Sequence, residues 1–413
     1  MSVRTTRLRL PALSAALIVS LTLAGCTADS GDGSSDLGSD DSNAEGVGSE
    51  DREGSEPDAV APSRVSANIK PRATDVTIDT PVRVRVDDGT FDSVVLRVHK
   101  GRELSGSLNA EKTVWTADEL LEPGTRYVVA TQAADAAGDV TKARRPFNTI
   151  KLADNQEVYP SVAPLDGEVV GIGMPVIVTF DAAVSDHAAF EKKMTVESTP
   201  SQRGGWHWMS DTEVHYRPAT YWQPGTKVDV LLDINSIPAG QGIYGQEDRE
   251  INFEIGNSVV MKANLQTDQM GVFIDGDLAR TIAITGGKAG FETRSGVKLI
   301  VEKFESKRMD AATVGIQPGD PEYYNIPSVE YAQRVTFTGE FLHAAPWSVS
   351  AQGSYNVSHG CVGMSTENAA WLFSQTHRGD PVEVTGTDRG MEEGNGWTDW
   401  NYSFAEWKQG SAL

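Results

Sequence analysis

The sequence is poor in cysteine: its 413 residues include only Cys26 and Cys361. A framework of disulfides is therefore excluded, and no pair of cysteines or histidines has the spacing of a zinc site. The seven histidines are scattered, and His207 and His215, which lie in one strand-rich region, lack a third ligand and are predicted to be structural. No Gly-rich loop of the kind that cradles phosphate is present. These absences leave individual side chains as the source of any chemistry.

Long apolar runs are also lacking, apart from residues 11–24 near the N-terminus. This run follows a basic segment and is shorter than the about 20 apolar residues that a membrane span needs. It ends in Leu-Ala-Gly-Cys26, which resembles a bacterial lipobox. We therefore predict that residues 1–25 are a lipoprotein signal peptide and that a lipid on Cys26 anchors the protein to the outer face of the cell membrane. The alternative is an ordinary signal peptide followed by a chance cysteine.

Positive charge is scarce relative to negative charge: 36 Lys and Arg face 58 Asp and Glu, for a formal net charge of −22 at pH 7. So acidic a chain is a poor partner for nucleic acid. Residues 29–58 contain eleven acids and the single base Arg52, with glycine and serine filling most of the rest. Such a segment buries too little apolar area to offset its conformational entropy, so residues 26–62 are predicted to be a disordered acidic tether.

No long helical period occurs before residue 257, and the pattern there is that of strands. Val82, Val84 and Val86 alternate with charged residues, as in a strand with one wet face. The turn Pro-Gly-Thr and its following strand occur at 123–125 and again at 224–226. This spacing fits immunoglobulin-like sandwiches of about 100 residues. The fold is predicted to be mainly β, with two such modules ahead of a third, β-rich unit.

The third unit is predicted to contain strands, hairpins and one short helix. Asp275 and Gly276 form a strong two-residue hairpin signal. Further strands are predicted at 297–303 and 335–341, and a helix at 366–377 with a serine as its N-cap.

The C-terminal segment is rich in aromatic side chains, among them Trp397, Trp400 and Trp407. Exposed aromatics in such number would cause aggregation, so the segment is predicted to pack back onto the body. The predicted division of the chain is a signal peptide (1–25), a tether (26–62), two immunoglobulin-like modules (63–150 and 151–256), the third unit (257–387) and a C-terminal subdomain (388–413).

The run Ser358-His359-Gly360-Cys361 is the most informative motif, because Cys361 is predicted to be the one free thiol. A lone thiol outside the cell is a liability unless its reactivity is used. His359 in the same run and His343 upstream are candidates to activate it. A protonated His343 beside the sulfur would lower the thiol pKa, and Gly360 would let main-chain N–H groups turn toward an oxyanion. The alternative makes His343 a satisfied interior histidine and Cys361 a small core residue.

Ser-His-Gly-Cys at 358–361, preceded by His-Ala-Ala-Pro-Trp at 343–347, resembles the catalytic motif of the L,D-transpeptidases. The whole chain resembles the mycobacterial-type members, which combine a lipobox, two immunoglobulin-like modules, the catalytic domain and an aromatic C-terminal subdomain. Gly-Ile-Gly-Met-Pro at 171–175 and Trp-His-Trp at 206–208 also match that group. The resemblance implies formation of 3→3 crosslinks in peptidoglycan through a thioester on the cysteine, with release of D-Ala and no cofactor. The implied partners are tetrapeptide donor stems, diaminopimelate acceptors and, as inhibitors, carbapenem-type β-lactams.

The resemblance also implies a role for each matching residue. Cys361 would be the nucleophile and His343 the general base and later acid, with the imidazole held by the main-chain carbonyl of Ala344, where relatives often have serine. Trp347 and Trp371 are predicted to pack rather than to contact substrate. Ser358, His359 and Gly360 complete the implied catalytic motif, and His359 and Gly360 would shape the oxyanion side. Met309 would begin the active-site lid, and Tyr324, with Tyr323 as the alternative, would be the lid tyrosine. Thr338 and Gly339 would line the acyl groove.

Two departures from the family pattern bear on function. Gly363 stands where Asn or Arg is common, which removes a side-chain contact to substrate or to the loop. Pro238 and Gln241 replace an acidic pair, so no calcium site is predicted. Two other functions stay open: a wall-binding lipoprotein with a degenerate catalytic domain, of which Gly363 would be a symptom, and a cysteine carboxypeptidase or amidase that uses water as acceptor.

Overall fold

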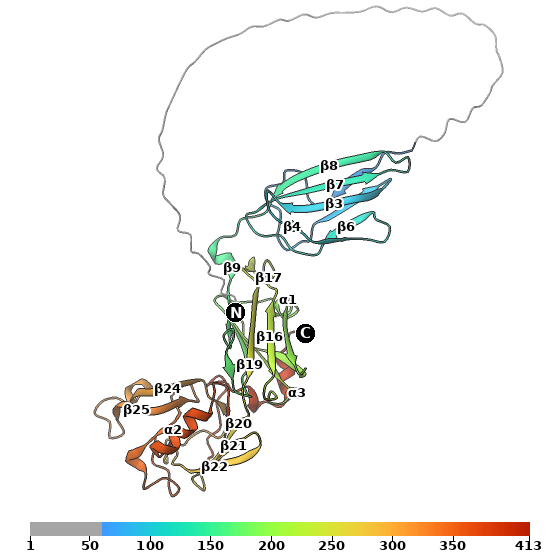
Figure 1. Cartoon of the computed structure of the whole chain (residues 1–413). Coiled ribbons are helices and arrows are strands. Elements are labelled where there is room, and N and C mark those ends of the chain that lie inside the picture. Colours follow the sequence, from blue (N-terminus) through green and yellow to red (C-terminus); the bar gives the residue numbers. More distant parts are fainter. Residues whose placement is uncertain (1–59) are drawn as a thin grey trace, which may run out of the picture. The chain divides into compact units, whose positions relative to one another are not determined.

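The computed structural model describes residues 60–413 (Figure 1). The predicted signal peptide, the predicted lipidation site Cys26 and nearly all of the predicted tether lie outside these residues. Within residues 60–413 no helix is long and apolar enough to cross a membrane. The predicted fold class is confirmed, since strands dominate and the helices are few and short.

Residues 64–148 form two four-stranded sheets that share one apolar core. Alternation sets the faces: Val84 and Val86 are buried, whereas Arg85 between them is exposed. Tyr127 stacks on Phe147 within the core, with ring centroids 5.5 Å apart. One sheet has the order β1 (Arg64–Ala67), β2 (Arg83–Asp87), β6 (Val114–Ala117), β5 (Gly106–Leu108), and the other β4 (Glu103–Leu104), β3 (Thr90–Val98), β7 (Arg126–Ala134), β8 (Val140–Asn148).

Residues 154–255 form a second β unit with its own core, in which Trp206 and Trp222 are buried. A short helix α1 (His187–Glu191) begins where the Asp186 side chain accepts a hydrogen bond from Ala189 N. The first sheet has the order β10 (Pro160–Ala163), β12 (Val176–Phe180), β15 (Glu213–Pro218), β14 (Gly204–Ser210). The second sheet has the order β11 (Val169–Val170), β19 (Arg249–Ile255), β16 (Lys227–Leu232), β13 (Met194–Thr199). A small sheet joins β17 (Pro238–Gly240), β18 (Ile243–Gly245) and β9 (Glu157–Val158), next to the 3-10 turn η1 (Asp154–Gln156).

The third unit contains two sheets, and helix α2 (Thr366–Gln375) packs against the four-stranded one (Figure 1). The predicted helix is confirmed, and Ser365 caps it by accepting from Asn368 N at 3.3 Å. Ala369 and Leu372 of α2 pack into the core that both sheets share. The five-stranded sheet has the order β22 (Asp277–Ala283), β21 (Gln269–Ile274), β20 (Val259–Asn264), β28 (Pro381–Thr385), β23 (Gly296–Leu299). The four-stranded sheet has the order β24 (Glu302–Asp310), β25 (Asn325–Arg334), β26 (Phe341–Ala344), β27 (Val362–Met364).

One predicted turn agrees with the structure, whereas two predicted strands do not. The Asp275-Gly276 hairpin is confirmed: both residues have positive φ, 50° and 91°, between β21 and β22. The predicted strand 297–303 is wrong in its middle, because β23 ends at Leu299 and β24 starts at Glu302 in the other sheet. The predicted strand 335–341 is also wrong. It is a turn between β25 and β26 that leaves Phe337 53% exposed.

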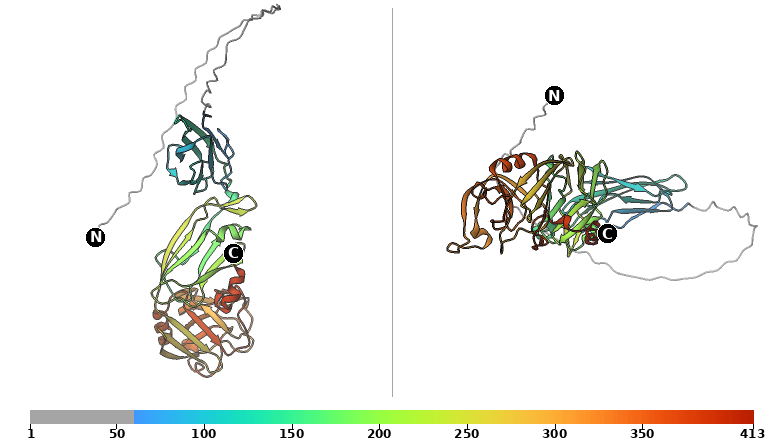
Figure 2. Two further views of the ribbon diagram at one scale, coloured as in Figure 1. Left: turned by 90° about the vertical axis from the view of Figure 1, so that its right-hand side faces the viewer. Right: turned by 90° about the horizontal axis from the view of Figure 1, so that it is seen from below.

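The aromatic C-terminus packs back onto residues 204–218, as predicted (Figure 2). Trp407 is fully buried, and its indole N–H donates to Gly205 O at 2.8 Å. The guanidinium of Arg217 lies over the rings of Trp400 and Trp407 at 4.6 and 4.8 Å. The elements of this segment are η4 (Asp399–Asn401), α3 (Phe404–Trp407) and η5 (Lys408–Gly410).

Candidate active site

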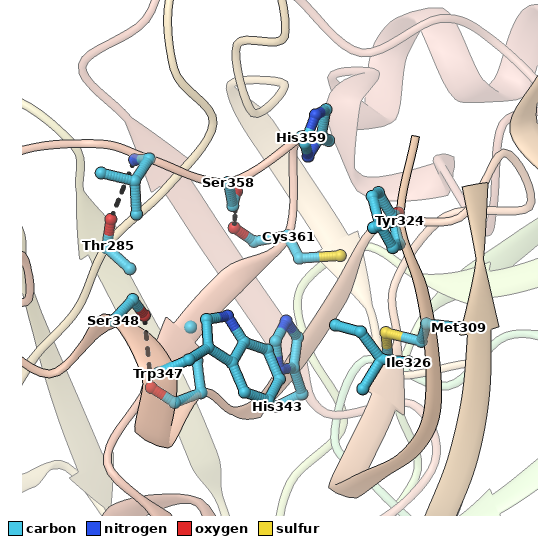
Figure 3. Close-up of a pocket in the computed structure, with 13 residues that line it drawn as sticks. Thr285, Met309, Tyr324, Ile326, His343, Trp347, Ser348, Ser358, His359 and Cys361 are labelled. Carbon is cyan, nitrogen blue, oxygen red and sulfur yellow. Dashed lines mark hydrogen bonds between the residues drawn. The ribbon is translucent and has the colours of Figure 1, made fainter. Parts of the chain in front are cut away.

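A cavity of about 310 Å³ in the third unit contains both Cys361 and His343 (Figure 3). His343 lies on β26, and Cys361 immediately precedes β27. These strands are parallel neighbours, and their register pairs His343 with Gly363, two residues after the cysteine. The strand pairing thus brings a histidine and a thiol, 18 residues apart in sequence, to one end of one sheet. The cavity is lined by Thr285, Met309, Tyr324, Ile326, His343, Ala345, Trp347, Ser348, Val357, Ser358, His359, Cys361 and Gly363.

The imidazole of His343 is oriented by the main chain. Its Nδ1 lies 2.7 Å from the carbonyl oxygen of Ala344, as the family resemblance implied. A carbonyl only accepts, so Nδ1 carries the hydrogen and Nε2 keeps a free lone pair. Burial lowers the pKa of His343, so the ring is a neutral base at pH 7.

The thiol of Cys361 is buried among Met309, Val329, Ala332 and Phe341. Burial raises the pKa of the thiol to about 12, although the main-chain amide of Phe341 lowers it. The structure therefore differs from the expected ion pair. A neutral imidazole and a protonated thiol share the resting site, because both groups are buried.

The turn that carries the cysteine is held by the hydroxyl of Ser358. Its Oγ donates to Cys361 O at 2.6 Å and accepts from Gly360 N at 3.1 Å. Gly360 has φ +120°, a conformation that favours glycine, and its carbonyl accepts from Thr293 Oγ1 at 2.8 Å. The N–H of Gly360 is thus already engaged by Ser358 and is not free to bind an oxyanion in this conformation.

His359 faces the segment expected to be the lid. Its Nε2 lies 2.7 Å from Glu322 Oε2, and Glu322 also pairs with Lys288. The His359 ring packs against Tyr324, with centroids 5.0 Å apart. Of the two candidate histidines, His359 is therefore tied to the lid, while His343 keeps a ring nitrogen free. Sequence reasoning missed Glu322, which lies 37 residues before His359 in no recognisable motif.

Tyr324 and Met309 separate two cavities, since both residues line each one. The second cavity, about 290 Å³, also contains Thr338 and Gly339, the predicted acyl-groove pair. The sulfur of Cys361 lies 3.6 Å from Gly339 O, so the thiol is within reach of this cavity as well. The alternative lid residue, Tyr323, lines neither cavity; its hydroxyl instead accepts from Asn325 at 3.2 Å.

Two tryptophans predicted to pack behave differently. Trp371 does pack, with Arg280 over its ring at 4.1 Å. Trp347 packs only in part: it stacks on His343, with ring centroids 5.8 Å apart, and is 56% exposed in the cavity wall. This residue lies in the short 3-10 turn η3 (Pro346–Ser348) that follows β26.

Gly363 occupies a tight place in the strand ladder. Its amide and carbonyl form hydrogen bonds of 2.9 Å with Thr285, and a Cβ here would lie 2.9 Å from that of Ala345. A larger side chain therefore needs Ala345 to shift. Thr285 and Ser348 complete the wall beside it.

A mainly β unit that presents a buried Cys–His pair in the Ser-His-Gly-Cys context defines the L,D-transpeptidase class. The family model described as L,D-transpeptidase catalytic domain matches residues 258–384, and a bacterial Ig domain model matches residues 73–238.

Two relatives from Mycobacterium tuberculosis are similar over most of the chain. L,D-transpeptidase 2 is 33% identical over 84% of this chain and 85% of its own length, and L,D-transpeptidase 5 is 34% identical over 83% and 75%. A solved structure of the L,D-transpeptidase LdtMt1 in complex with imipenem is 35% identical, with a TM-score of 0.48, over 55% of this chain and 97% of that one. The chain belongs to the L,D-transpeptidase family.

Proposed function

We propose that the protein forms 3→3 crosslinks in peptidoglycan with Cys361 as nucleophile and His343 as general base and acid. The observation that carries the proposal is the pair itself. One cavity contains a buried thiol and an imidazole whose Nδ1 is fixed on Ala344 O, which leaves Nε2 to take the thiol proton.

The reaction would run in two steps. Nε2 of His343 accepts the proton of the thiol as the sulfur attacks the carbonyl of the third residue of a donor stem. The bond to D-Ala breaks, and the imidazolium returns a proton to the departing amine, which leaves a thioester on Cys361. The side-chain amine of a diaminopimelate on a neighbouring stem then attacks the thioester. The new amide forms, the sulfur leaves, and the proton passes through His343 to the thiol.

Two neighbouring cavities, which share Met309 and Tyr324 as lining residues, support transfer between two peptides. A transpeptidase must hold a donor and an acceptor on different sides of the acyl group. The first cavity has an apolar wall with Trp347 and Ile326, and the second contains Lys307, Arg308 and Arg334. Stem peptides carry several carboxylates, which could bind Lys307 or replace Asp310 and Glu302 as the partners of Arg308 and Arg334.

The same sulfur would be acylated by carbapenem-type β-lactams, whose strained amide presents an equivalent carbonyl. We further propose that a lipid on Cys26 anchors the protein to the outer face of the cell membrane, so that the catalytic unit works in the cell wall. The free nucleophile and the wall peptides would then share one compartment.

Mass spectrometry of the products made from purified disaccharide-tetrapeptide tests the proposal. The wild type and Cys26→Ala should give 3→3 dimers and free D-Ala, whereas Cys361→Ala and His343→Gln should give neither. Tripeptide without dimers would show that water is the acceptor and would favour a carboxypeptidase. Absence of every product, together with no imipenem adduct on Cys361, would favour the wall-binding alternative.

A further inference from the structure

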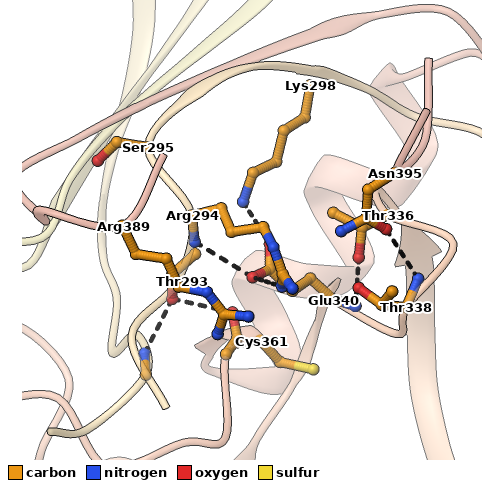
Figure 4. A network of polar contacts seen from close by, with 12 residues as sticks. Thr293, Arg294, Ser295, Lys298, Thr336, Thr338, Glu340, Cys361, Arg389 and Asn395 are labelled. Carbon is orange, nitrogen blue, oxygen red and sulfur yellow. Dashed lines mark hydrogen bonds and ion pairs between the residues drawn. The ribbon is translucent and has the colours of Figure 1, made fainter. Parts of the chain in front are cut away.

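Three charged side chains are buried together behind the turn that carries Cys361 (Figure 4). Lys298 on β23 is 1% exposed, Glu340 4% and Arg294 8%. Such residues are almost never this buried unless they are paired, because each loses its hydration. Apolar replacements of similar volume are often neutral or stabilising, so stability alone is a weak reason for the cluster.

The carboxylate of Glu340 is the centre of this cluster. Its Oε1 accepts from the main-chain amide of Arg294 at 3.1 Å and from Nη1 of the same residue at 2.9 Å. Its Oε2 accepts from Nζ of Lys298. On the outer side, Nε of Arg294 donates to Glu392, whose side chain is half exposed. Both oxygens of Glu340 are engaged with cations, so this residue is not placed to serve as an acid or a base.

The cluster also contacts the catalytic turn. A Cβ on Gly360 would lie 3.4 Å from Cγ of Glu340 and 3.5 Å from its Oε1, so this side chain lies directly beneath the turn. Thr293, next to Arg294 in the chain, donates to Gly360 O at 2.8 Å. Glu340 itself directly precedes β26, the strand of His343. One cluster thus supports both the turn of the nucleophile and the strand of the base.

The charges of the cluster act on the sulfur with opposite signs. Burial is the main cause of the raised pKa of the thiol; the charge of Glu340 raises this pKa further, and the charge of Lys298 lowers it. Such interactions are strengthened where water is excluded. The other titratable groups that face the sulfur are His343 on β26, Arg334 on β25 and Tyr324 directly before β25.

We propose that Lys298 and Glu340 are positioning residues for the Cys361 nucleophile: Glu340 fixes Lys298 behind the turn, and the Lys298 cation stabilises the negative charge that develops on the sulfur during attack. This inference rests on the proposed function, since it concerns the ionisation of the proposed nucleophile. It requires that substitutions of Lys298 and Glu340, which form an ion pair with each other, change the reactivity of the thiol in opposite directions. A pair that merely supports the fold would change it in one direction.

The test is the pH dependence of alkylation of Cys361 by iodoacetamide in the full chain, followed by mass spectrometry of the peptide that contains Cys361. Lys298→Met should lower the rate at each pH by about tenfold, which corresponds to one unit in thiol pKa. Glu340→Gln should raise the rate at each pH, because the cations then act unopposed. Lys303→Met is the matched control: Lys303 is a half-buried lysine that bonds to Phe373 O and Thr376 O and does not act on the sulfur.

A loosened site would expose the thiol and make it more reactive in both variants, so slower alkylation of Lys298→Met is the decisive result. Should that variant not fold, Lys298→Gln replaces it, because its amide can still donate to Glu340. Equal rates in all variants, or shifts of the same sign in both, overturn the inference. Imipenem acylation of the wild type is measured in parallel. If imipenem does not acylate the wild type, the proposed function is refuted. If imipenem acylates the wild type but the alkylation rates of the variants do not change, only the role of the cluster is refuted.

Discussion

His343 is oriented by the residue that follows it: its Nδ1 donates to the carbonyl oxygen of Ala344 at 2.7 Å. The orienting group belongs to the main chain, so the side chain at 344 contributes little to it. Ala344 is 1% exposed and lies within the core shared by the two sheets, so the strand that carries the imidazole is packed in place. The proposed base is therefore oriented by strand geometry rather than by a carboxylate partner.

From this relationship we expect imipenem to acylate the Ala344→Ser variant at a rate within about twofold of the wild-type rate. The added hydroxyl leaves the main-chain carbonyl in place. In the His343→Gln variant, in contrast, the acylation rate should fall by about 100-fold or more, which is the usual contribution of a general base. Stopped-flow measurement of acylation compares the two. A tenfold loss in Ala344→Ser would mean that the side chain takes part in orienting the ring.

On the proposed mechanism, the lowered pKa of His343 determines how the acylation rate falls in acid solution. Burial holds this pKa below the ordinary value of 6.5, so the neutral, basic form persists as the pH falls to 6.5 and is lost only in more acid solution. The acylation rate should therefore change little between about pH 8 and about pH 6.5 and fall below that. A rate already halved at pH 7 would contradict the neutral-base arrangement.

The hydroxyl of Ser358 joins two ends of the catalytic turn, so its loss should affect rate more than stability. Ser358→Ala removes two hydrogen bonds, each worth about 1 kcal/mol, and frees the turn to move. We expect acylation to slow by about tenfold or more, since small displacements of a nucleophile are costly. Ser358→Thr keeps the oxygen and should recover most of the rate. The control is Ser374→Ala, whose hydroxyl donates to Trp371 O on α2, away from the site.

Glu322 links the lid segment to the catalytic motif through His359 and Lys288. These two partners hold the pKa of Glu322 below its ordinary value, with Lys288 the larger cause, so the contact persists into mildly acid solution. Glu322→Ala should lower kcat/KM severalfold while the unfolding midpoint stays nearly constant, because the pairs lie at the surface. Glu330→Gln, an exposed carboxylate on β25, is the control. An unchanged kcat/KM in Glu322→Ala would show that the lid is held by Tyr324 alone.

Local signals in the sequence predicted local structure well. Ser365 with its periodic apolar stripe predicted α2, and Asp275-Gly276 predicted a hairpin, because each depends on neighbours within a few residues. The segment 335–341 was misread because its alternating apolar residues mimic a strand. Phe337 is in fact exposed and lines the second cavity, so its side chain contributes to no core.

The catalytic motif was likewise predictable, but its supports were not. Ser358 to Cys361 is contiguous, and His343 precedes it at a family spacing. Glu340, however, meets Arg294 and Lys298 across 46 and 42 residues, and no pattern in the sequence marks these three as partners. The protonation state was also missed. The expected ion pair left out the effect of burial, which raises the pKa of the Cys361 thiol and lowers that of His343.

His215 couples stability to pH at the contact between the second β unit and the C-terminal segment. Its Nδ1 lies 2.8 Å from Asp399 Oδ1 and its Nε2 3.0 Å from Glu213 Oε1. Burial alone would lower the pKa of His215, but Asp399 and Glu213 outweigh it and raise the pKa to about 9. A histidine whose pKa is raised on folding stabilises the folded state fully when the pH is below its pKa in the unfolded chain, about 6.5. This contribution to the free energy of unfolding, up to about 3 kcal/mol, is lost as the pH rises through the folded-state pKa of about 9.

The unfolding midpoint of the wild type should therefore fall between about pH 6.5 and about pH 9, as His215 loses its charge beside two carboxylates. The double variant His215→Gln, Asp399→Asn removes the charged pair and should flatten this dependence. The single variant His215→Gln should be far less stable at every pH, because it leaves the fully buried Asp399 without its cation. Differential scanning calorimetry across this range measures all three proteins. A wild-type midpoint that stays level up to pH 9 would show that the imidazole is already neutral in the folded protein, and the aromatic C-terminus would then be held by Trp407 and its neighbours without help from charge.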